Sequence, residues 1–266
     1  EAIGDMPLNR AANPGLETWQ LAGNPGRGAA VLTALVWAGI GWLTLQGRPR
    51  IGLVAMVIAG VLAAQFGQTA NIAAFAAGAL AYLVGYIAPR FGLIAVSLSI
   101  AAWLAAAPFA LNILLPLTSG LSMPYSWAAR IEIWRYVTAQ IPENLWLGHG
   151  LDASRADPAQ IVVQGQTVSA IPLHPHSASL QIWFETGAVG AGLGALCLLL
   201  GGAALARALG AKREAAAAAC GAMAAIAVIA NVSFGAWQEW WTAAILIAAG
   251  LVAALAALRD TSLNRA

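Results

Sequence analysis

Seven long apolar stretches, almost free of charged side chains, are the feature that most limits what this chain can fold into. A membrane-crossing helix needs about 20 mostly apolar residues to span a hydrocarbon core roughly 30 Å thick. Stretches close to that length occupy approximately residues 28–47, 51–67, 69–88, 91–118, 178–207, 215–233 and 238–258. They do not alternate polar with apolar residues, as the strands of a membrane β-barrel would. We therefore expect an all-α fold, a polytopic membrane helical bundle of about seven transmembrane helices with one large outer loop.

The composition agrees with this class of fold. Of the 266 residues, 60% are hydrophobic and 9% are charged, whereas a soluble domain carries about 25% charged residues. The net charge of +2 is too small to predict a nucleic-acid partner, so the expected surrounding is the lipid bilayer. Cys197 and Cys220 are far from a CxxC spacing, which argues against a cysteine metal site or a disulfide framework.

The basic residues predict how the chain crosses the membrane. Eight of the thirteen lie around 48–50, 90 and 207–213 and in the tail 259–266. If seven helices alternate, these four groups share one side, which the positive-inside rule assigns to the cytoplasm. The predicted division is an outer N-terminal segment, a helical region, an outer loop, a second helical region and a cytoplasmic tail, at 1–27, 28–118, 119–177, 178–258 and 259–266.

This topology places the first residue outside the membrane. A chain whose N-terminus begins in the cytoplasm would need an odd number of further helices upstream. We therefore expect the sequence to be the C-terminal part of a longer protein. Two short outer connections, a tight turn at 67–69 and a turn at 234–238, complete the predicted topology.

The loop 119–177 is the only predicted outer loop long enough to form a site by itself. Within it, residues 126–140 have the pattern of a short amphipathic helix that ends before Pro142. Trp127, Arg130 and Trp134 recur on one face at three- and four-residue spacing. A helix of this kind is typical of a membrane interface, with Trp at the level of the headgroups and Arg facing anionic groups.

The motifs of this loop and of the next helix occur in a characteristic order. They are Arg130-x3-Trp134, then Gly148-His149-Gly150, then His174-Pro175-His176-x3-Leu180-Gln181-x3-Glu185-x-Gly187-x2-Gly190. Over about residues 125–190 they resemble the outer loop and following helix of the bacterial O-antigen ligase and polymerase superfamily. Its members are multi-spanning membrane glycosyltransferases of the GT-C type, and this chain would correspond to their C-terminal portion.

The resemblance implies a reaction on the periplasmic face of the bacterial inner membrane. A glycan carried on undecaprenyl diphosphate is transferred to a lipid-linked sugar acceptor, such as the lipid A core, with no cofactor and no metal ion. Arginine suits a diphosphate because its donors are planar and permanently charged, and histidine can accept a hydroxyl proton near neutral pH. By position, Arg130 would bind diphosphate and His176 would be the base with His174 beside it. Glu185, counted with the substrate-binding residues, would orient a loop residue or cap the helix interior.

One feature of the family is missing. Its members commonly carry a second arginine after a Ser at the outer start of an earlier helix, where residues 68–71 of this chain read Gln-Thr-Ala-Asn. Either Arg135 or Arg155 then takes its place in binding the substrate, or fewer charges hold the diphosphate, or the activity differs.

Other interpretations of the same residues remain open. Arg130 and Arg135 would also serve as interfacial anchors or as partners of Glu132, and a histidine between two glycines fits a turn. His174 and His176 would also fit loop packing, or a zinc site with the third histidine, because three imidazoles suffice for a catalytic zinc ion.

Further alternatives concern the helices and the overall function. Glu185 fits a structural hydrogen bond as well as a catalytic role, because an unpaired carboxylate in an apolar segment is costly. The tryptophans of the last outer turn form either an aromatic belt or a platform for a sugar: Trp237, Trp240 and Trp241. The alternatives to a ligase are a polymerase of lipid-linked repeat units and a non-catalytic membrane transport component.

Overall fold

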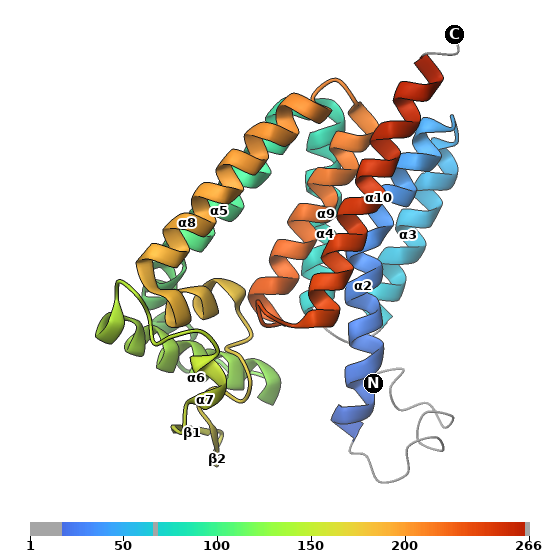
Figure 1. Cartoon of the computed structure of the whole chain (residues 1–266). Coiled ribbons are helices and arrows are strands. Elements are labelled where there is room, and N and C mark those ends of the chain that lie inside the picture. Colours follow the sequence, from blue (N-terminus) through green and yellow to red (C-terminus); the bar gives the residue numbers. More distant parts are fainter. Residues whose placement is uncertain (1–17, 66–68, 264–266) are drawn as a thin grey trace. The chain divides into compact units, whose positions relative to one another are not determined.

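The computed structural model describes residues 18–65 and 69–263, and these residues are mostly helical (Figure 1). The helices are α2 (Thr18–Leu45), α3 (Pro49–Gln65), α4 (Thr69–Ile87), α5 (Pro89–Leu114), α6 (Tyr125–Gln140), α7 (Ala153–Ala156), α8 (Ala178–Leu209), α9 (Arg213–Val232) and α10 (Glu239–Leu263). Short 3-10 turns follow α5 at Leu115–Thr118 and α6 at Ile141–Asn144. Strands β1 (Gln160–Val163) and β2 (Gln166–Ser169) form an antiparallel hairpin, which the sequence analysis did not predict.

Six of the described helices are long and apolar enough to cross a membrane. The seventh predicted crossing corresponds to α3, an apolar helix of 17 residues. The prediction of an all-α polytopic membrane bundle is confirmed. The largest change of boundary is at α2, which begins at Thr18 rather than near residue 28, so that 18–27 are helical. Residues 1–17 and Gln68, on which parts of the predicted topology depend, lie outside the described residues.

The chain divides into two compact units. Among the described residues, the first comprises 18–65, 69–97, 201–229 and 239–263, and contains α2, α3, α4, α9 and α10. Its core surrounds Trp37, whose fully buried ring lies 5.2 Å from that of Phe75. The facing helix α9 buries a run of small residues at 215–222, because small side chains let helices approach closely within a membrane.

The second unit comprises residues 98–200 and 230–238 and contains the outer loop with its histidines. Within it α5 and α8 lie side by side (Figure 1), and Trp183 Nε1 donates a 2.7 Å hydrogen bond to Leu104 O. Helix α6 matches the predicted helix 126–140 to within one residue. Its Trp134 is 8% exposed and donates to Pro175 O at 2.8 Å. Protein therefore covers this side chain, which does not lie at a lipid interface as the sequence pattern suggests.

Helix α8 is interrupted at Gly187, where φ is +64° and ψ is −164°. An unbroken helix would bond the N–H groups of residues 188 and 189 to the carbonyls of 184 and 185. Here the loop backbone takes both sets of partners. Phe184 O and Glu185 O accept from His149 N and Gly150 N, while Ala188 N and Val189 N donate to Leu145 O and Trp146 O, at 2.8–3.1 Å. The loop is thereby attached to α8 through four backbone hydrogen bonds.

Close backbone contact at this kink explains two glycines of the motif. A Cβ atom on Gly187 would lie 2.5 Å from the carbonyl of Trp146, and one on Gly148 would lie 2.5 Å from the backbone of Glu185. Gly148 also has a positive φ of +69°, in the region that glycine adopts without steric cost. These residues allow the loop to enter the opened helix, and this contact brings loop residues 149–152 next to Glu185.

Candidate functional site

The end of α9 and the turn that follows it hold the two principal candidates through successive backbone carbonyls. Arg130 Nε donates to Val232 O at 2.9 Å, and His176 Nδ1 lies 2.8 Å from Ser233 O. The end of α9 is also bonded to the start of α8, because Asn231 Oδ1 accepts from the backbone N–H of residue 179 at 3.3 Å. The structure therefore brings Arg130 and His176, which are 46 residues apart in the sequence, onto adjacent peptide groups.

The contact with Ser233 determines which nitrogen of His176 carries the proton. A carbonyl oxygen only accepts hydrogen bonds, so Nδ1 must be the donor and Nε2 of the neutral ring keeps a lone pair. Burial lowers the pKa of His176, and the charge of Arg130 lowers it further, against the opposing effect of the Ser233 hydrogen bond. His176 also has a left-handed backbone, with φ +55°. The ring is thus held neutral, with Nε2 as the proton acceptor.

His174 is held neutral as well, but with the opposite tautomer. Its Nδ1 accepts from the backbone N–H of His176 at 3.1 Å, so the ring proton belongs on Nε2. Burial, with the positive charges of Arg130 and Arg155 and the neighbouring His176, lowers the pKa of His174 to about 3. The two imidazole rings meet edge to face with centroids 4.6 Å apart. His174 therefore positions the backbone of His176 and is unsuited to carry a proton near neutral pH.

The amide of Gln238 lies against Nε2 of His174, with 3.1 Å between the two nitrogens. Both nitrogens would be donors in this tautomer. When the amide turns by 180°, its oxygen accepts the Nε2 proton, and exchange of the two amide atoms is compatible with the same side-chain shape. This rotation gives the amide oxygen Oε1 of Gln238 a donor, the Nε2 proton of His174, whereas before the rotation Oε1 is buried and without a partner among the described residues.

Arg130 is a partly buried cation whose described partners are neutral. Besides Val232 O, its guanidinium donates to Ser126 O at 2.7 Å and lies over the Trp127 ring, 5.5 Å from its centroid. Burial lowers the pKa of Arg130. In the described part of the chain, no carboxylate forms an ion pair with it. Its remaining N–H groups, chiefly those of Nη2, are available for an anion.

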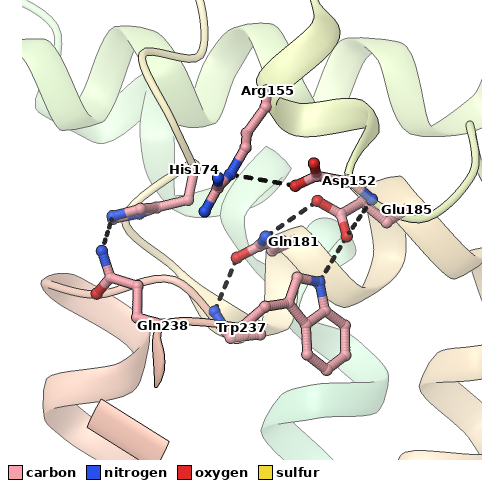
Figure 2. Close-up of polar contacts among 8 residues, drawn as sticks. Asp152, Arg155, His174, Gln181, Glu185, Trp237 and Gln238 are labelled. Atoms are coloured by element: carbon pink, nitrogen blue, oxygen red, sulfur yellow. Dashed lines mark hydrogen bonds and ion pairs between the residues drawn. The ribbon is translucent and has the colours of Figure 1, made fainter. Parts of the chain in front are cut away.

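The structure separates the other two arginines of the predicted site. Arg135 is five residues after Arg130 on α6, so it points about 140° away. It forms a 2.6 Å ion pair with Glu132 and donates to Leu115 O at 3.2 Å. Arg155, on α7, forms an exposed 3.2 Å ion pair with Asp152 on the side of His174 (Figure 2). Arg155 therefore lies near the site, whereas Arg135 joins α6 to the end of α5.

Glu185 is the most buried charged group of the site, at 1% exposure, and all its described partners are donors (Figure 2). Oε1 accepts from Gln181 Nε2 at 3.0 Å, and Oε2 accepts from Trp237 Nε1 at 2.6 Å and Asp152 N at 3.3 Å. Gln181 extends the network, because its Oε1 accepts from Ala236 N at 2.8 Å. A deprotonated carboxylate, which only accepts, satisfies every member.

His149 has a structural environment. Its ring stacks on that of Phe184 with centroids 4.4 Å apart, and its two nitrogens lie 3.2 Å from Asn144 Nδ2 and Gln140 O. Within residues 18–65 and 69–263, no group of three His, Cys, Asp or Glu side chains is placed to hold a metal ion. The turn interpretation of His149 agrees with these contacts.

Several parts of the site were missed by sequence reasoning. The carbonyls of Val232 and Ser233 carry no residue-type signal, because any residue presents the same backbone group. Gln181 stands within the motif, but its amide became informative only once Ala236 was placed beside it. Trp237 was noted only as one of three turn tryptophans. Its bond to a buried carboxylate distinguishes it from the others in a way that spacing does not reveal.

The fold and this site together define a multi-pass helical membrane protein with a cation and an oriented imidazole outside its spans. Comparison with known proteins agrees with this class. The family model described as O-antigen ligase matches residues 21–195. A Rickettsia conorii protein named "Putative polysaccharide ligase" is 31% identical over 227 residues, covering 81% of this chain and 54% of its own length. No solved structure matches the chain significantly.

Two further relatives bear the same printed name. A Rickettsia typhi protein is 27% identical over 190 residues, covering 65% of this chain and 44% of its own length. A Rickettsia bellii protein is 28% identical over 183 residues, covering 63% and 43%. The chain belongs to the O-antigen ligase family. It spans about half the length of these relatives.

Proposed function

We propose that this protein transfers a glycan from an undecaprenyl diphosphate donor to a sugar hydroxyl of a lipid-linked acceptor, such as the lipid A core, on the periplasmic face of the inner membrane. Family membership supports a ligase that acts on polysaccharide. The observation that carries the proposal is the pairing of His176 with Arg130 on the successive carbonyls of Ser233 and Val232. The proposed base and the proposed diphosphate-binding cation are thus bonded to adjacent peptide groups.

The proposed step uses both groups directly. Nε2 of His176 removes the proton from the acceptor hydroxyl, whose oxygen forms a bond to the anomeric carbon of the donor glycan. The bond from that carbon to the diphosphate oxygen breaks, and its electron pair leaves with the diphosphate. Arg130 offers its free N–H groups to the phosphate oxygens, whose negative charge grows in the transition state. Diphosphate is already a good leaving group, so the scheme needs no metal ion.

Helix lengths support a location at the membrane surface. Beyond the kink, residues 188–209 of α8 extend about 33 Å at 1.5 Å per residue, close to the thickness of a hydrocarbon core. Helix α9 has 20 residues and ends at Val232, which is itself a site residue. Both spans therefore end where the site begins, at the depth where the diphosphate of a lipid carrier would lie.

The missing family arginine leaves Arg155 as the candidate second cation. Its partner Asp152 and Arg155 itself are 66% and 58% exposed, and exposed ion pairs of this kind contribute little. Arg155 is therefore free to exchange Asp152 for a phosphate oxygen. Arg135 is tied by three hydrogen bonds to Glu132, Leu115 and Thr118, so we assign it a structural role.

The test is the surface polysaccharide of cells that carry His176→Ala or Arg130→Ala as the only copy of the gene. Each variant is expected to abolish the polymer ladder of ligated lipopolysaccharide while lipid-linked glycan accumulates. Arg50→Ala, which removes an exposed arginine outside this unit, is the charge-matched control.

Two outcomes would contradict the proposal. If cells with His176→Ala or Arg130→Ala show the same polymer ladder as the parent, neither residue is needed for the reaction. If the variants instead transfer single repeat units to the acceptor without polymer, the activity is polymerisation of lipid-linked units.

Transfer measured in membranes should also decline only below pH 6.5, since the pKa of His176 is lowered from that ordinary value.

A further inference from the structure

Trp237 combines exposure with a rigid attachment. Its side chain is 48% exposed, yet each of residues 236–238 is bonded to the segment that contains the histidines and the start of α8. The backbone N–H of residue 236 donates to Gln181 at 2.8 Å, and the indole N–H of Trp237 donates to Glu185 at 2.6 Å. The side-chain amide of residue 238 lies 3.1 Å from the ring of His174 (Figure 2). The exposed part of the ring is thus held in one orientation, on the same turn whose Ser233 carbonyl contacts His176.

The indole N–H distinguishes this residue from an ordinary interfacial tryptophan. In an aromatic belt the apolar ring faces lipid while the N–H reaches the wet headgroup region. The N–H of Trp237 instead points inward to Glu185, whose carboxylate is almost completely buried. Burying a carboxylate is costly unless donors surround it, and this one is satisfied by donors that include the indole. What Trp237 offers outward is therefore the apolar part of its ring.

We propose that the exposed face of Trp237 is a stacking platform for a pyranose ring of the glycan that reacts at His176, and that Glu185 is the positioning residue that holds this platform. The C–H groups on one face of a pyranose form an apolar surface that matches an aromatic ring, while its hydroxyls remain free for polar partners. The choice of reaction rests on the proposed function. The platform itself rests on the exposure and anchoring of the ring.

The donor glycan and the acceptor saccharide both present pyranose rings, so binding is measured with each of them. The two probes are core lipopolysaccharide from a ligase-deficient strain of the host and the lipid-linked glycan that accumulates in the same strain. The protein is the full gene product in lipid nanodiscs, in a His176→Ala background that prevents turnover. Trp237→Leu is expected to weaken binding of one probe about threefold to tenfold, the range expected for loss of one aromatic contact.

A matched control is available on the same unit. Trp146 is 70% exposed and lies on the loop attached to the kink of α8, so Trp146→Leu removes a comparable exposed ring. It is expected to leave both affinities unchanged. Trp237→Phe keeps a ring but loses the donor to Glu185, and should give an intermediate affinity even if Trp237→Leu folds poorly.

The role of Glu185 is tested by a double-mutant cycle. Glu185→Gln replaces one acceptor oxygen by an amide donor facing groups that are themselves donors, so it should weaken binding of the same probe as Trp237→Leu. If Glu185 acts through the indole, adding Glu185→Gln to Trp237→Leu should cause little further loss. Independent, additive losses would show that Glu185 does not position the platform.

The outcomes separate this proposal from the proposed function. Equal binding by Trp237→Leu and its background, or no binding of either probe by the background, would overturn the platform. If wild-type protein fails to transfer glycan but Trp237→Leu still weakens binding, the transfer reaction is wrong and the platform stands. If transfer proceeds but Trp237→Leu changes neither affinity, the transfer reaction stands and the platform is wrong.

Discussion

Replacing Gly187 by alanine tests whether the opened kink of α8 assembles the site. The residue has φ +64° and ψ −164°, a combination that is essentially restricted to glycine. An added Cβ would lie 2.5 Å from the carbonyl carbon and oxygen of Trp146 and 2.6 Å from the nitrogen of Gly148. These neighbours are backbone atoms, so neither can move aside without breaking the hydrogen bonds that hold the loop to α8.

The two costs can be summed from general values. A residue forced into a sparsely populated backbone region costs about 1–3 kcal/mol, and overpacking costs roughly a further 1–3 kcal/mol. Gly187→Ala should therefore lower the free energy of unfolding by about 2–6 kcal/mol. The alternative is for α8 to close into a regular helix and expel residues 145–150. Expulsion would remove Gly150 and Asp152 from Glu185.

The assay is unfolding in mixed micelles, combined with amide hydrogen exchange in native membranes. Gly187→Ala should unfold more readily and lose protection at His149 and Gly150, whose N–H groups bond the loop to the helix. Ala188 and Val189 should lose protection too if α8 stays open, and keep it if α8 closes, because their N–H groups then bond to the carbonyls of residues 184 and 185. Unchanged stability together with unchanged protection at these four amides would refute the reasoning.

Two other glycines serve as controls. Gly192, on the same helix, has no atom within 4 Å of an added Cβ, so alanine there should stabilise by up to about 1 kcal/mol. Gly150 has φ +103° but open space around it, so Gly150→Ala isolates the backbone cost from the clash and should be milder than Gly187→Ala.

Two further predictions concern charge. Burial holds the pKa of His174 in the folded protein at about 3, below its ordinary value of 6.5. Unfolding therefore takes up a proton, and stability should fall as the pH drops below about 6.5 and level off near 3. Unfolding measured at each pH should show a smaller decline for His174→Asn; an equal decline would assign the effect elsewhere. Arg135→Ala should cost about 1–2 kcal/mol of unfolding free energy because it leaves Leu115 O and Glu132 without this donor, whereas Arg155→Ala should cost less than about 1 kcal/mol. The reverse order in the same measurement would contradict the assigned roles.

The apolar periodicity and the motif spacing predicted much of the molecule. Six of the seven predicted spans match long apolar helices, and α6 starts within one residue of its prediction. Arg130, His176 and Glu185 were predicted from the resemblance of their motifs to the O-antigen ligase and polymerase superfamily, and the clustered histidines also stand out in a chain with 9% charged residues. The sequence left Arg135 open as a second substrate-binding arginine beside Arg130. Their different roles follow from a 140° rotation about α6 and from which carbonyls lie opposite them.

The sequence by itself determined the membrane class, the approximate ends of most helices and the residues that can hold charge or move a proton. Each of these depends on local composition or on spacing within one element. Only the tertiary structure decided the tautomer of His176, the neutral state of His174 and the attachment of Trp237 to Glu185. His176 and Trp237 contact partners 57 and 52 residues away in the sequence, and burial by the surrounding segments lowers the pKa of His174. Local spacing does not reveal such long-range contacts, and a backbone carbonyl has the same chemistry whatever residue carries it.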